Sequence, residues 1–406
     1  MKFSTELLHG TSPDKLTGST TQPIYQTSAY FQETAEDMEK IFVGRKPGFV
    51  YTRVNNPTIA NFERRIAALE HGIGAVAFSS GMSAISMAIM NIVESGDEIV
   101  ANSGLFGGTS AFFNEIKNFG VNVKYVIENK IDNFVELLSE NTKLIYVETI
   151  GNPKLDVADI KSLAELAHSK NLPLFVDNTV TTPYLIRPLD LGADVVIHST
   201  SKMINGGGNS IGGIVICGKN FKWNPEKFPK LADFAKFGNL SYILRLRNIM
   251  LMNFGGCAAP FNVFLTGVGL DTLELRMQRS CDNAISLAKF LSGQKNIQVN
   301  YPGLKNNFYH ELAKNQFNNK FGTMLTIRLE SKENAFKFIN SLKFALNVSN
   351  IGDARTLVIH PASTIYLHAN ESEKINAGVT DDLVRISVGL EDISDLISDF
   401  EQAITG

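Results

Sequence analysis

Two carboxylates and a lysine follow short apolar runs in the middle of the chain. Glu148 follows residues 144–147, Asp177 follows residues 172–176, and Lys202 lies shortly after residues 194–197. If these runs are neighbouring parallel strands, their carboxyl ends bring the three side chains to one sheet edge, where open α/β sheets bind ligands. A lysine can form a Schiff base with a carbonyl group, and a carboxylate can keep a pyridine nitrogen protonated. Any one of these residues could simply enter a loop, but the trio predicts pyridoxal 5'-phosphate (PLP) chemistry, with Lys202 as the Schiff-base lysine and Asp177 beneath the ring.

A phosphate group would need backbone N–H donors and hydroxyls, and one segment offers both. Residues 79–84 follow the apolar run 75–78 and open the helical pattern 84–93. A helix N-terminus suits an anion, although an ordinary serine-capped helix has the same pattern. Ser199 and Ser201, beside Lys202, could add hydroxyls. The glycines at 206–208, 212 and 213 do not precede a helix and match no nucleotide-binding loop, so a dinucleotide site is not predicted.

Arg385 stands in the alternating segment 384–388, where it and Ser387 face one way and three apolar residues face the other. A mid-strand arginine needs a partner. A substrate carboxylate would fit its two-pronged donor, and a structural salt bridge would serve equally well. The seven histidines have no metal-ligand spacing, so no metal site is predicted, and His198 is interpreted as structural.

These residues must be positioned by recurring apolar runs with helical patterns between them. Such runs occupy residues 74–78, 98–101, 123–127, 144–147, 172–176, 194–197 and 213–216. This predicts an α/β domain over residues 59–253, with a mostly parallel sheet covered on both faces. Residues 1–58 are expected to form an extended arm with short helical pieces. Residues 254–406 predict a smaller α+β domain, with a helix at 270–291 and strands at 321–329, 345–350 and 384–388.

The composition excludes several classes of protein. The 406 residues are 44% hydrophobic and 19% charged, with a net charge of −3 and no long run of either sign. No basic patch indicates nucleic-acid or membrane-surface binding, and no stretch reaches the length of a membrane span. Three scattered cysteines fit a reducing compartment, so a cytoplasmic protein is expected.

With these residues in place, the chain resembles the Cys/Met-metabolism family of PLP enzymes, almost from end to end. The segments that carry the resemblance are Tyr51-Thr52-Arg53-Val54-Asn55-Asn56-Pro57-Thr58, Ser80-Gly81-Met82, Val176-Asp177-Asn178-Thr179 and His198-Ser199-Thr200-Ser201-Lys202. The resemblance implies the fold-type I aminotransferase-like architecture. It also implies that Lys202 binds the cofactor and moves protons, and that Asp177 pairs with the pyridine nitrogen. The remaining implied cofactor contacts are Gly81, Met82, Ser199 and Ser201 at the phosphate and Asn152 near the phenolic oxygen.

The same resemblance implies the substrate contacts and the assembly. Arg385 corresponds to the carboxylate-binding arginine, and Glu148 and Asn350 are expected beside the amino-acid substrate. Tyr51 and Arg53 would reach the phosphate of a neighbouring subunit, so two chains would complete each site. A homotetramer built from such dimers is expected.

Finer features resemble the branch that joins O-acetylhomoserine and sulfide to give homocysteine and acetate. They include residues 350–361, which begin Asn-Ile-Gly, and Gly108 where methionine γ-lyases carry cysteine. A γ-lyase, a cystathionine γ-synthase or lyase, or a non-catalytic member of the fold remains an alternative. The acyl group and the sulfur donor stay open. Phe106 stands where the family usually has tyrosine, so it can stack on the ring but cannot move a proton, and Lys202 or a water would have to do so.

Overall fold

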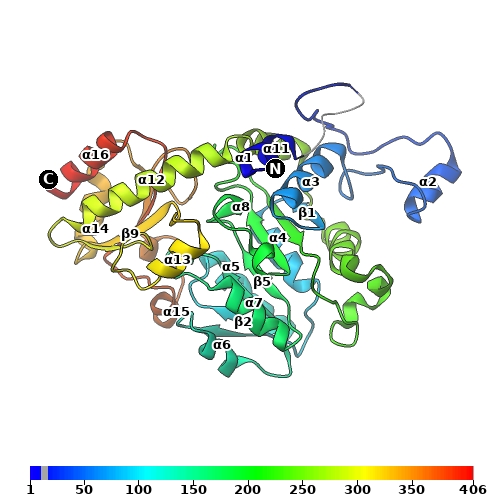
Figure 1. Ribbon diagram of the computed structural model, residues 1–406, viewed down its shortest axis with the longest axis horizontal. Coiled ribbons are helices and arrows are strands. Elements are labelled where there is room, and N and C mark those ends of the chain that lie inside the picture. The colour runs from blue at the N-terminus through cyan, green and yellow to red at the C-terminus, as the bar shows by residue number, and fades with distance from the viewer. Residues whose placement is uncertain (11–16, 406) are drawn as a thin grey trace.

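A computed structural model describes residues 1–10 and 17–405. Its larger sheet has seven strands in the order β1-β7-β6-β5-β4-β2-β3 (Figure 1). The strands are β1 (Gly74–Phe78), β2 (Glu98–Asn102), β3 (Asn122–Val126), β4 (Thr142–Glu148), β5 (Leu174–Asp177), β6 (Val195–Ser199) and β7 (Gly213–Cys217). Each contains or overlaps one of the apolar runs, and the expected α/β class is confirmed.

One strand breaks the parallel arrangement. β7 is antiparallel to both of its neighbours, β1 and β6, while β2 to β6 pair in parallel. The segment between β6 and β7 carries no helix, so it returns the chain in the opposite direction, whereas a parallel pairing needs a long crossover. The sheet is therefore mostly parallel, with a single reversed strand.

Helices cover both faces of this sheet, which explains why its strands are apolar throughout. Along β4, Leu144 and Tyr146 pack into one core, and Ile145 and Val147 pack into the core on the opposite face. The helices of this part are α3 (Pro57–Leu69), α4 (Gly81–Met90), α5 (Gly107–Glu115), α6 (Ile131–Leu137), α7 (Ile160–Ser169), α8 (Thr182–Leu185), α9 (Ser241–Arg245), α10 (Met252–Phe254) and α11 (Pro260–Leu270), with 3-10 segments at η1 (Ile116–Phe119), η2 (Pro188–Leu191) and η3 (Pro229–Leu240) and a π-helical segment at η4 (Leu246–Leu251).

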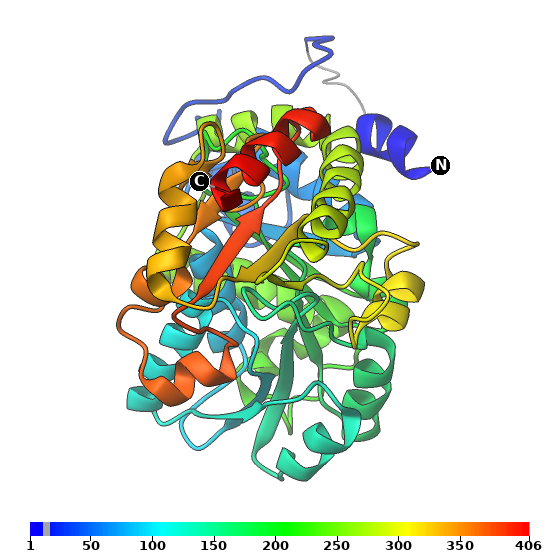
Figure 2. The same cartoon turned by 90° about the vertical axis from the view of Figure 1, so that its left-hand side faces the viewer.

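The C-terminal part of the chain builds a second sheet, in the order β10-β11-β12-β9-β8. Its strands are β8 (Gln298–Asn300), β9 (Met324–Arg328), β10 (Leu346–Asn347), β11 (Leu357–Ile359) and β12 (Leu383–Ser387). Figure 2 shows this sheet with helices packed over it. The helices of this part are α12 (Leu273–Ser292), α13 (His310–Gln316), α14 (Lys332–Ser341), α15 (Glu371–Asn376) and α16 (Ile393–Thr405), with a short turn at η5 (Pro361–Ser363).

The N-terminal segment has two short helices, α1 (Phe3–His9) and α2 (Ala35–Phe42). No residue of α2 is buried, and Figure 1 shows this helix projecting away from the rest of the chain. Of the arm expected at 1–58, residues 11–16 lie outside the described part, as does Gly406 at the other end.

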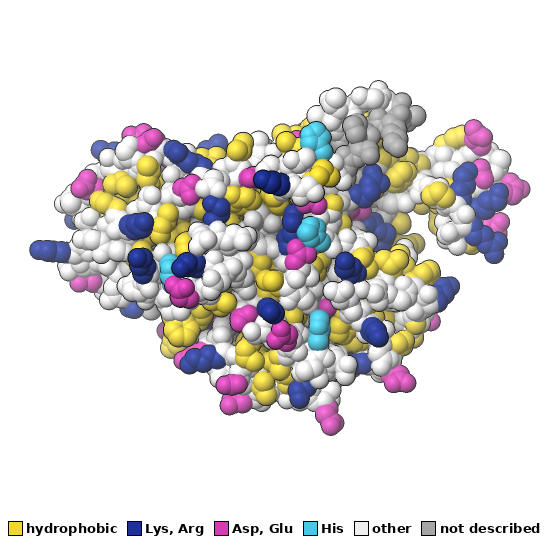
Figure 3. Space-filling view, in the orientation of Figure 1, with side chains coloured by type: hydrophobic (Ala, Val, Ile, Leu, Met, Phe, Trp, Pro, Cys, Tyr) yellow, Lys and Arg dark blue, Asp and Glu magenta, His cyan; other side chains and the backbone are white. Residues whose placement is uncertain are grey.

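Acidic and basic side chains are interspersed over the face shown in Figure 3. None of the helices in the described ranges is long and apolar enough to cross a membrane.

Candidate active site

A cavity of about 480 Å³ lies at the carboxyl ends of the parallel strands. The residues that line it and that the sequence had singled out are Gly81, Met82, Phe106, Glu148, Asn152, Asp177, Ser199, Ser201, Lys202, Asn350 and Arg385. They come from both sheets and from loops spread over 300 residues of sequence. The fold therefore brings residues of separate sequence motifs into one cavity.

Lys202 enters this cavity from the loop after β6. Its Nζ atom donates a hydrogen bond to Asn350 Oδ1 at 2.5 Å. Burial, helped by the positive charge of Arg385, lowers the pKa of the lysine amine. Because only a neutral amine can attack a carbonyl group or accept a proton, this environment favours both tasks.

Asp177 and Glu148 end adjacent strands and face each other in register. Asp177 Oδ1 accepts a hydrogen bond from the Thr179 N–H at 3.0 Å. Burial nevertheless raises the pKa of Asp177 above its ordinary value. Burial and the charge of Asp177 raise the pKa of Glu148 well above its usual range, and Glu148 Oε1 accepts the Phe106 N–H at 2.6 Å. Glu148 therefore fixes the loop that presents the Phe106 ring to the cavity.

The start of α4 forms a cradle for an anion. Ser80 caps the helix by accepting from the Ser83 N–H at 3.0 Å, and a helix leaves its first N–H groups without partners inside the helix. Gly81 must be glycine here, because a Cβ atom would lie 2.6 Å from Ser199 Cβ. The Ser199 side chain therefore sits directly against the helix start. The Ser201 hydroxyl is already engaged, since it bonds with the backbone of Gly212.

Arg385 is the most unusual charge in the site, with 3% of its surface exposed. Its Nη1 atom donates to Asn152 Oδ1 and its Nη2 atom to the Asn350 carbonyl, both at 3.0 Å, while Nε has no partner. Burial lowers the pKa of this guanidinium to about 10. Within the described ranges no carboxylate neutralises it, so the structural salt bridge that the sequence left open is absent there. A buried cation with a spare donor suits a carboxylate ligand.

These groups fit PLP. The Lys202 amine, with its lowered pKa, suits the aldehyde of PLP. The buried Asp177 carboxylate, on the strand adjacent to β6, suits its ring nitrogen. The start of α4, where Gly81 leaves room, suits its phosphate. Over residues 1–10 and 17–405, no group of three or more metal-binding side chains could hold a metal ion.

Tyr51 and Arg53 are not among the residues that line this cavity. Tyr51 is 45% exposed, and the Arg53 guanidinium lies 5.4 Å from its ring centroid and bonds the Met252 carbonyl.

Other lining residues were not predicted, among them Thr179, Ser210, Ser349 and the isoleucines 211, 351 and 365. Thr179 could have been found, because it lies two residues beyond Asp177 at the same strand end. Its hydroxyl accepts the Ser199 N–H at 2.8 Å and so ties the two neighbouring strand ends together. The isoleucines carry no signal in the sequence that separates them from core residues.

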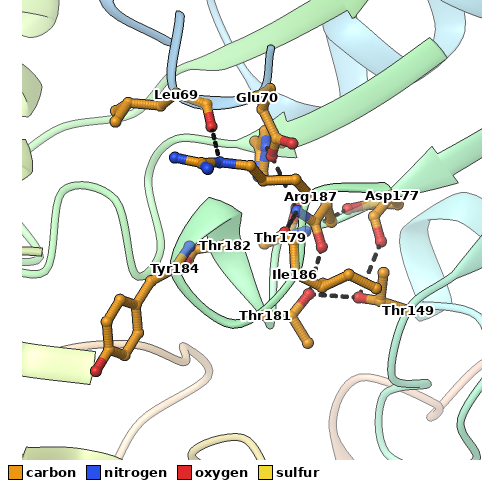
Figure 4. A network of polar contacts seen from close by, with 12 residues as sticks. Leu69, Glu70, Thr149, Asp177, Thr179, Thr181, Thr182, Tyr184, Ile186 and Arg187 are labelled. Atoms are coloured by element: carbon orange, nitrogen blue, oxygen red, sulfur yellow. Dashed lines mark hydrogen bonds and ion pairs between the residues drawn. The ribbon is translucent and has the colours of Figure 1, made fainter. Parts of the chain in front are cut away.

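A fully buried chain of polar side chains lies behind Asp177 (Figure 4). The Thr149 and Thr181 hydroxyls are 2.7 Å apart, and Thr181 bonds Asn178. Asn178 donates to Glu70 Oε1 at 2.9 Å, and the same oxygen lies 2.6 Å from His198 Nε2. This chain joins the carboxyl ends of β4, β5 and β6.

Comparison with known proteins agrees with the geometry. The chain is 42% identical to the homocysteine synthase of Schizosaccharomyces pombe, over 99% of this chain and 98% of that protein. It is 40% identical to the O-acetyl-L-homoserine sulfhydrylase of Leptospira meyeri, over 99% and 96%.

Among solved structures, a putative O-acetylhomoserine (thiol)-lyase from Campylobacter jejuni, which carries N'-pyridoxyl-lysine-5'-monophosphate, superimposes with a TM-score of 0.95 and 33% identity over the whole of both chains. The profile of one family matches residues 4–405. The chain therefore belongs to the Cys/Met metabolism PLP-dependent enzymes.

Proposed function

We propose that this enzyme converts O-acetyl-L-homoserine and sulfide to L-homocysteine and acetate. The observation that carries the proposal is the buried, unneutralised Arg385 in the same cavity as Lys202 and Asp177. Such a site takes an amino acid by its carboxylate and holds its α carbon beside a base. Relatives of full length named homocysteine synthase and O-acetyl-L-homoserine sulfhydrylase support this choice of reaction.

Several residues would hold the cofactor. When bound, PLP supplies an electron-accepting ring that stabilises negative charge at the substrate's α carbon. Asp177 would pair with the ring nitrogen, and Phe106 would stack on the ring. Asn152, whose Oδ1 accepts from Arg385, would donate from its Nδ2 to the phenolic oxygen. The phosphate would lie at the Gly81 and Met82 N–H groups, near Ser199 and Ser201.

Arg385 would bind the substrate carboxylate through its guanidinium. Lys202 would take the α proton of the bound substrate, since its lowered pKa favours the neutral form. Asn350 positions both groups, with its side chain on Lys202 and its carbonyl on Arg385. Phe106 has no hydroxyl, so the proton transfers fall to Lys202 rather than to an aromatic side chain.

The walls of the cavity favour a neutral acyl group. Beyond the polar residues it is lined by Ile85, Ile211, Ile351 and Ile365. Within the described lining, Lys202 and Arg385 are the cations, and both are already assigned. A succinyl group would place a second carboxylate against apolar walls, which is costly without a partner. Acetyl is therefore the proposed acyl group.

The assembly is part of the proposal. Tyr51 and Arg53 lie outside this chain's cavity, on the segment beside the projecting helix α2, which suits a role at a neighbouring subunit's phosphate. We propose a homotetramer, built as a dimer of dimers, in which each cavity is completed by the partner chain, and which acts in the cytoplasm. The proposed division of the chain is an arm at 1–58, a cofactor-binding domain at 59–253 and a C-terminal domain at 254–406.

The test is to give the PLP-loaded enzyme O-acetyl-L-homoserine with and without sulfide, and to follow homocysteine, acetate and keto acid. Sulfide-dependent homocysteine with equal acetate is expected, and O-succinyl-L-homoserine should be a poorer substrate. Keto acid formed without sulfide, or cystathionine formed from added cysteine, would instead identify a lyase or a cystathionine synthase.

A further inference from the structure

The turn that carries Lys202 is held by an arginine from a distant helix. Residues 200–205 form neither helix nor strand, and Met203 and Ile204 in this turn are buried. Arg276 lies in the first turn of α12, and it donates from Nη1 to the Met203 carbonyl at 2.6 Å and from Nη2 to the Ile204 carbonyl at 3.1 Å. We propose that Arg276 is a positioning residue for Lys202, and that it fixes the backbone beside the lysine so that the amine keeps the position from which it bonds PLP. The proposal deepens the proposed function and rests on its assignment of Lys202, but not on the acyl group or the sulfur donor.

The guanidinium of Arg276 uses donors on all three of its nitrogen atoms. Its Nη2 atom also donates to the Gly269 carbonyl at 2.7 Å, and its Nε atom donates to Thr272 Oγ1 at 3.1 Å. Gly269 lies near the end of α11, and Thr272 directly precedes α12. One planar group therefore ties the turn after Lys202 to the junction between α11 and α12. A lysine carries its donors at a single point and could not make this set of contacts.

The turn and this junction approach each other so closely that each needs a glycine at the contact. A Cβ atom on Gly206 would collide with the Arg276 guanidinium. A Cβ atom on Gly269 would collide with the Asn205 carbonyl. The Gly206 N–H in turn donates to the Lys202 carbonyl at 2.8 Å. The residue packed against the guanidinium is therefore hydrogen-bonded to the backbone of the lysine itself.

Stability alone does not account for a charged group at this place. Burial lowers the pKa of the Arg276 guanidinium to about 10, and no carboxylate in the described part of the chain forms an ion pair with it. Burying a cation without an anion is costly, and hydrogen bonds to carbonyl groups offset only part of that cost. A reactive amine, in contrast, needs this precision, because a misplacement of about 1 Å can cost about 100-fold in rate.

The experiment compares how two forms of the cofactor bind the full-length apoprotein. PLP has the aldehyde that reacts with the Lys202 amine, whereas pyridoxamine 5'-phosphate has the same ring and phosphate but no aldehyde. The dissociation constants of both are measured by calorimetry for the wild type and for Arg276→Ala. We expect the variant to bind PLP at least about tenfold more weakly, the effect of one lost hydrogen bond to a charged group, and to bind pyridoxamine 5'-phosphate within about twofold of the wild type.

Two further variants calibrate this comparison. Lys202→Ala removes the amine and should abolish the preference for PLP over pyridoxamine 5'-phosphate. Because Arg276 acts through Lys202, the variant that lacks both side chains should show the same preference as Lys202→Ala alone. Arg279→Ala is the matched control on the same helix, since the Arg279 guanidinium donates to the Glu391 carbonyl at 3.2 Å instead of to the turn. Both affinities should stay unchanged in this control.

The outcomes separate this proposal from the one on which it rests. Equal losses of affinity for both ligands in Arg276→Ala would show a merely structural role, and that result, like no loss at all, overturns the positioning role. A preference for PLP that survives in Lys202→Ala overturns the assignment of Lys202 itself. If Arg276→Ala does not fold, Arg276→Lys keeps the charge but brings its donors to one point, so it should lose part of the preference for PLP. A full preference in Arg276→Lys would contradict the proposal.

Discussion

Charge burial is the dominant feature of the site at the scale of single residues. Arg385 and Lys202 are both desolvated, and each carries a lowered pKa. Glu148 and Asp177 are desolvated too, with raised pKa values. Buried ionisable groups with shifted pKa values are common in active sites, where a substrate or cofactor can change their charge. The burial of these four groups is therefore consistent with binding and catalysis.

Arg385→Gln should weaken substrate binding without loss of stability. A hydrogen bond to a charged group contributes about 1.5–3 kcal/mol, so KM for the amino-acid substrate should rise about 10- to 100-fold. The variant also removes a buried, unneutralised cation, so the free energy of unfolding should stay constant or increase. Arg328→Gln, on the neighbouring strand β9 with a half-exposed side chain, is the control and should keep its KM. A KM that does not move in Arg385→Gln would contradict the role of Arg385.

Glu148→Gln should change how stability depends on pH in the cofactor-free protein. The pKa of Glu148 is raised on folding, so the folded state keeps a proton that the unfolded state loses above its ordinary pKa. This group therefore costs the wild type up to about 1.4 kcal/mol per pH unit as pH rises. Glutamine removes the cost and keeps an oxygen for the Phe106 N–H. Thermal melts from pH 5 to 8 should show the variant's advantage in Tm growing with pH, and a constant difference would show that Glu148 is ionised in the fold.

At the scale of elements, the start of α4 and the end of β6 depend on their close approach. Gly81→Ala would put a methyl group 2.6 Å from Ser199 Cβ and force the helix start away from the strand end. The N–H donors would then move away from the phosphate, and the affinity of the apoprotein for PLP should fall at least about tenfold, the loss of one good hydrogen bond.

Gly267→Ala in α11 is the matched control, since its Cβ would meet only Arg65 Nη1, at 3.7 Å. It should bind PLP as the wild type does. Titration of the apoproteins with PLP, followed by absorbance, measures both. Equal affinity in Gly81→Ala would place the phosphate elsewhere.

The elements show where sequence reasoning reaches its limit. The runs ending at Glu148 and Asp177 could be predicted because strands buried on both faces are apolar throughout. β8 and β11 were missed, since strands of three residues are too short to show a period. The reversal of β7 was missed because direction depends on the connection, and the glycine-rich segment before it gives no sign of the path.

The same limit applies to the site. Lys202, Asp177 and Arg385 have residue types that suggest chemistry, and the structure gathers them in one cavity. The isoleucine walls and the pairing of Glu70 with His198 depend on contacts between segments far apart in sequence. His198 was interpreted as structural because it adjoins a strand end, and its local sequence does not show the contact with Glu70, 128 positions away.

At the scale of the whole molecule, the proposed site has one part in this chain's cavity and another part, Tyr51 and Arg53, outside it. Large apolar side chains are exposed near both parts, namely Phe31 on the arm, Phe42 in α2 and Ile211 at the cavity. A contiguous exposed apolar patch marks contact with another chain, and the proposed dimer would cover these side chains. A two-fold dimer would bring the arm of each chain to the cavity of the other.

Subunit mixing tests this arrangement. Lys202→Ala should be inactive because it lacks the amine that binds the cofactor and moves the proton, and Arg53→Ala should bind PLP poorly because it fails to reach the partner's phosphate. If each cavity takes Lys202 from one chain and Arg53 from the other, a mixed dimer has one doubly defective site and one intact site. Unfolding and refolding the two variants together should then restore roughly a quarter of wild-type activity, since about half of randomly paired dimers are mixed. Refolding either variant alone is the control. No recovery, although mixed dimers form, would mean that Arg53 serves the cavity of its own chain.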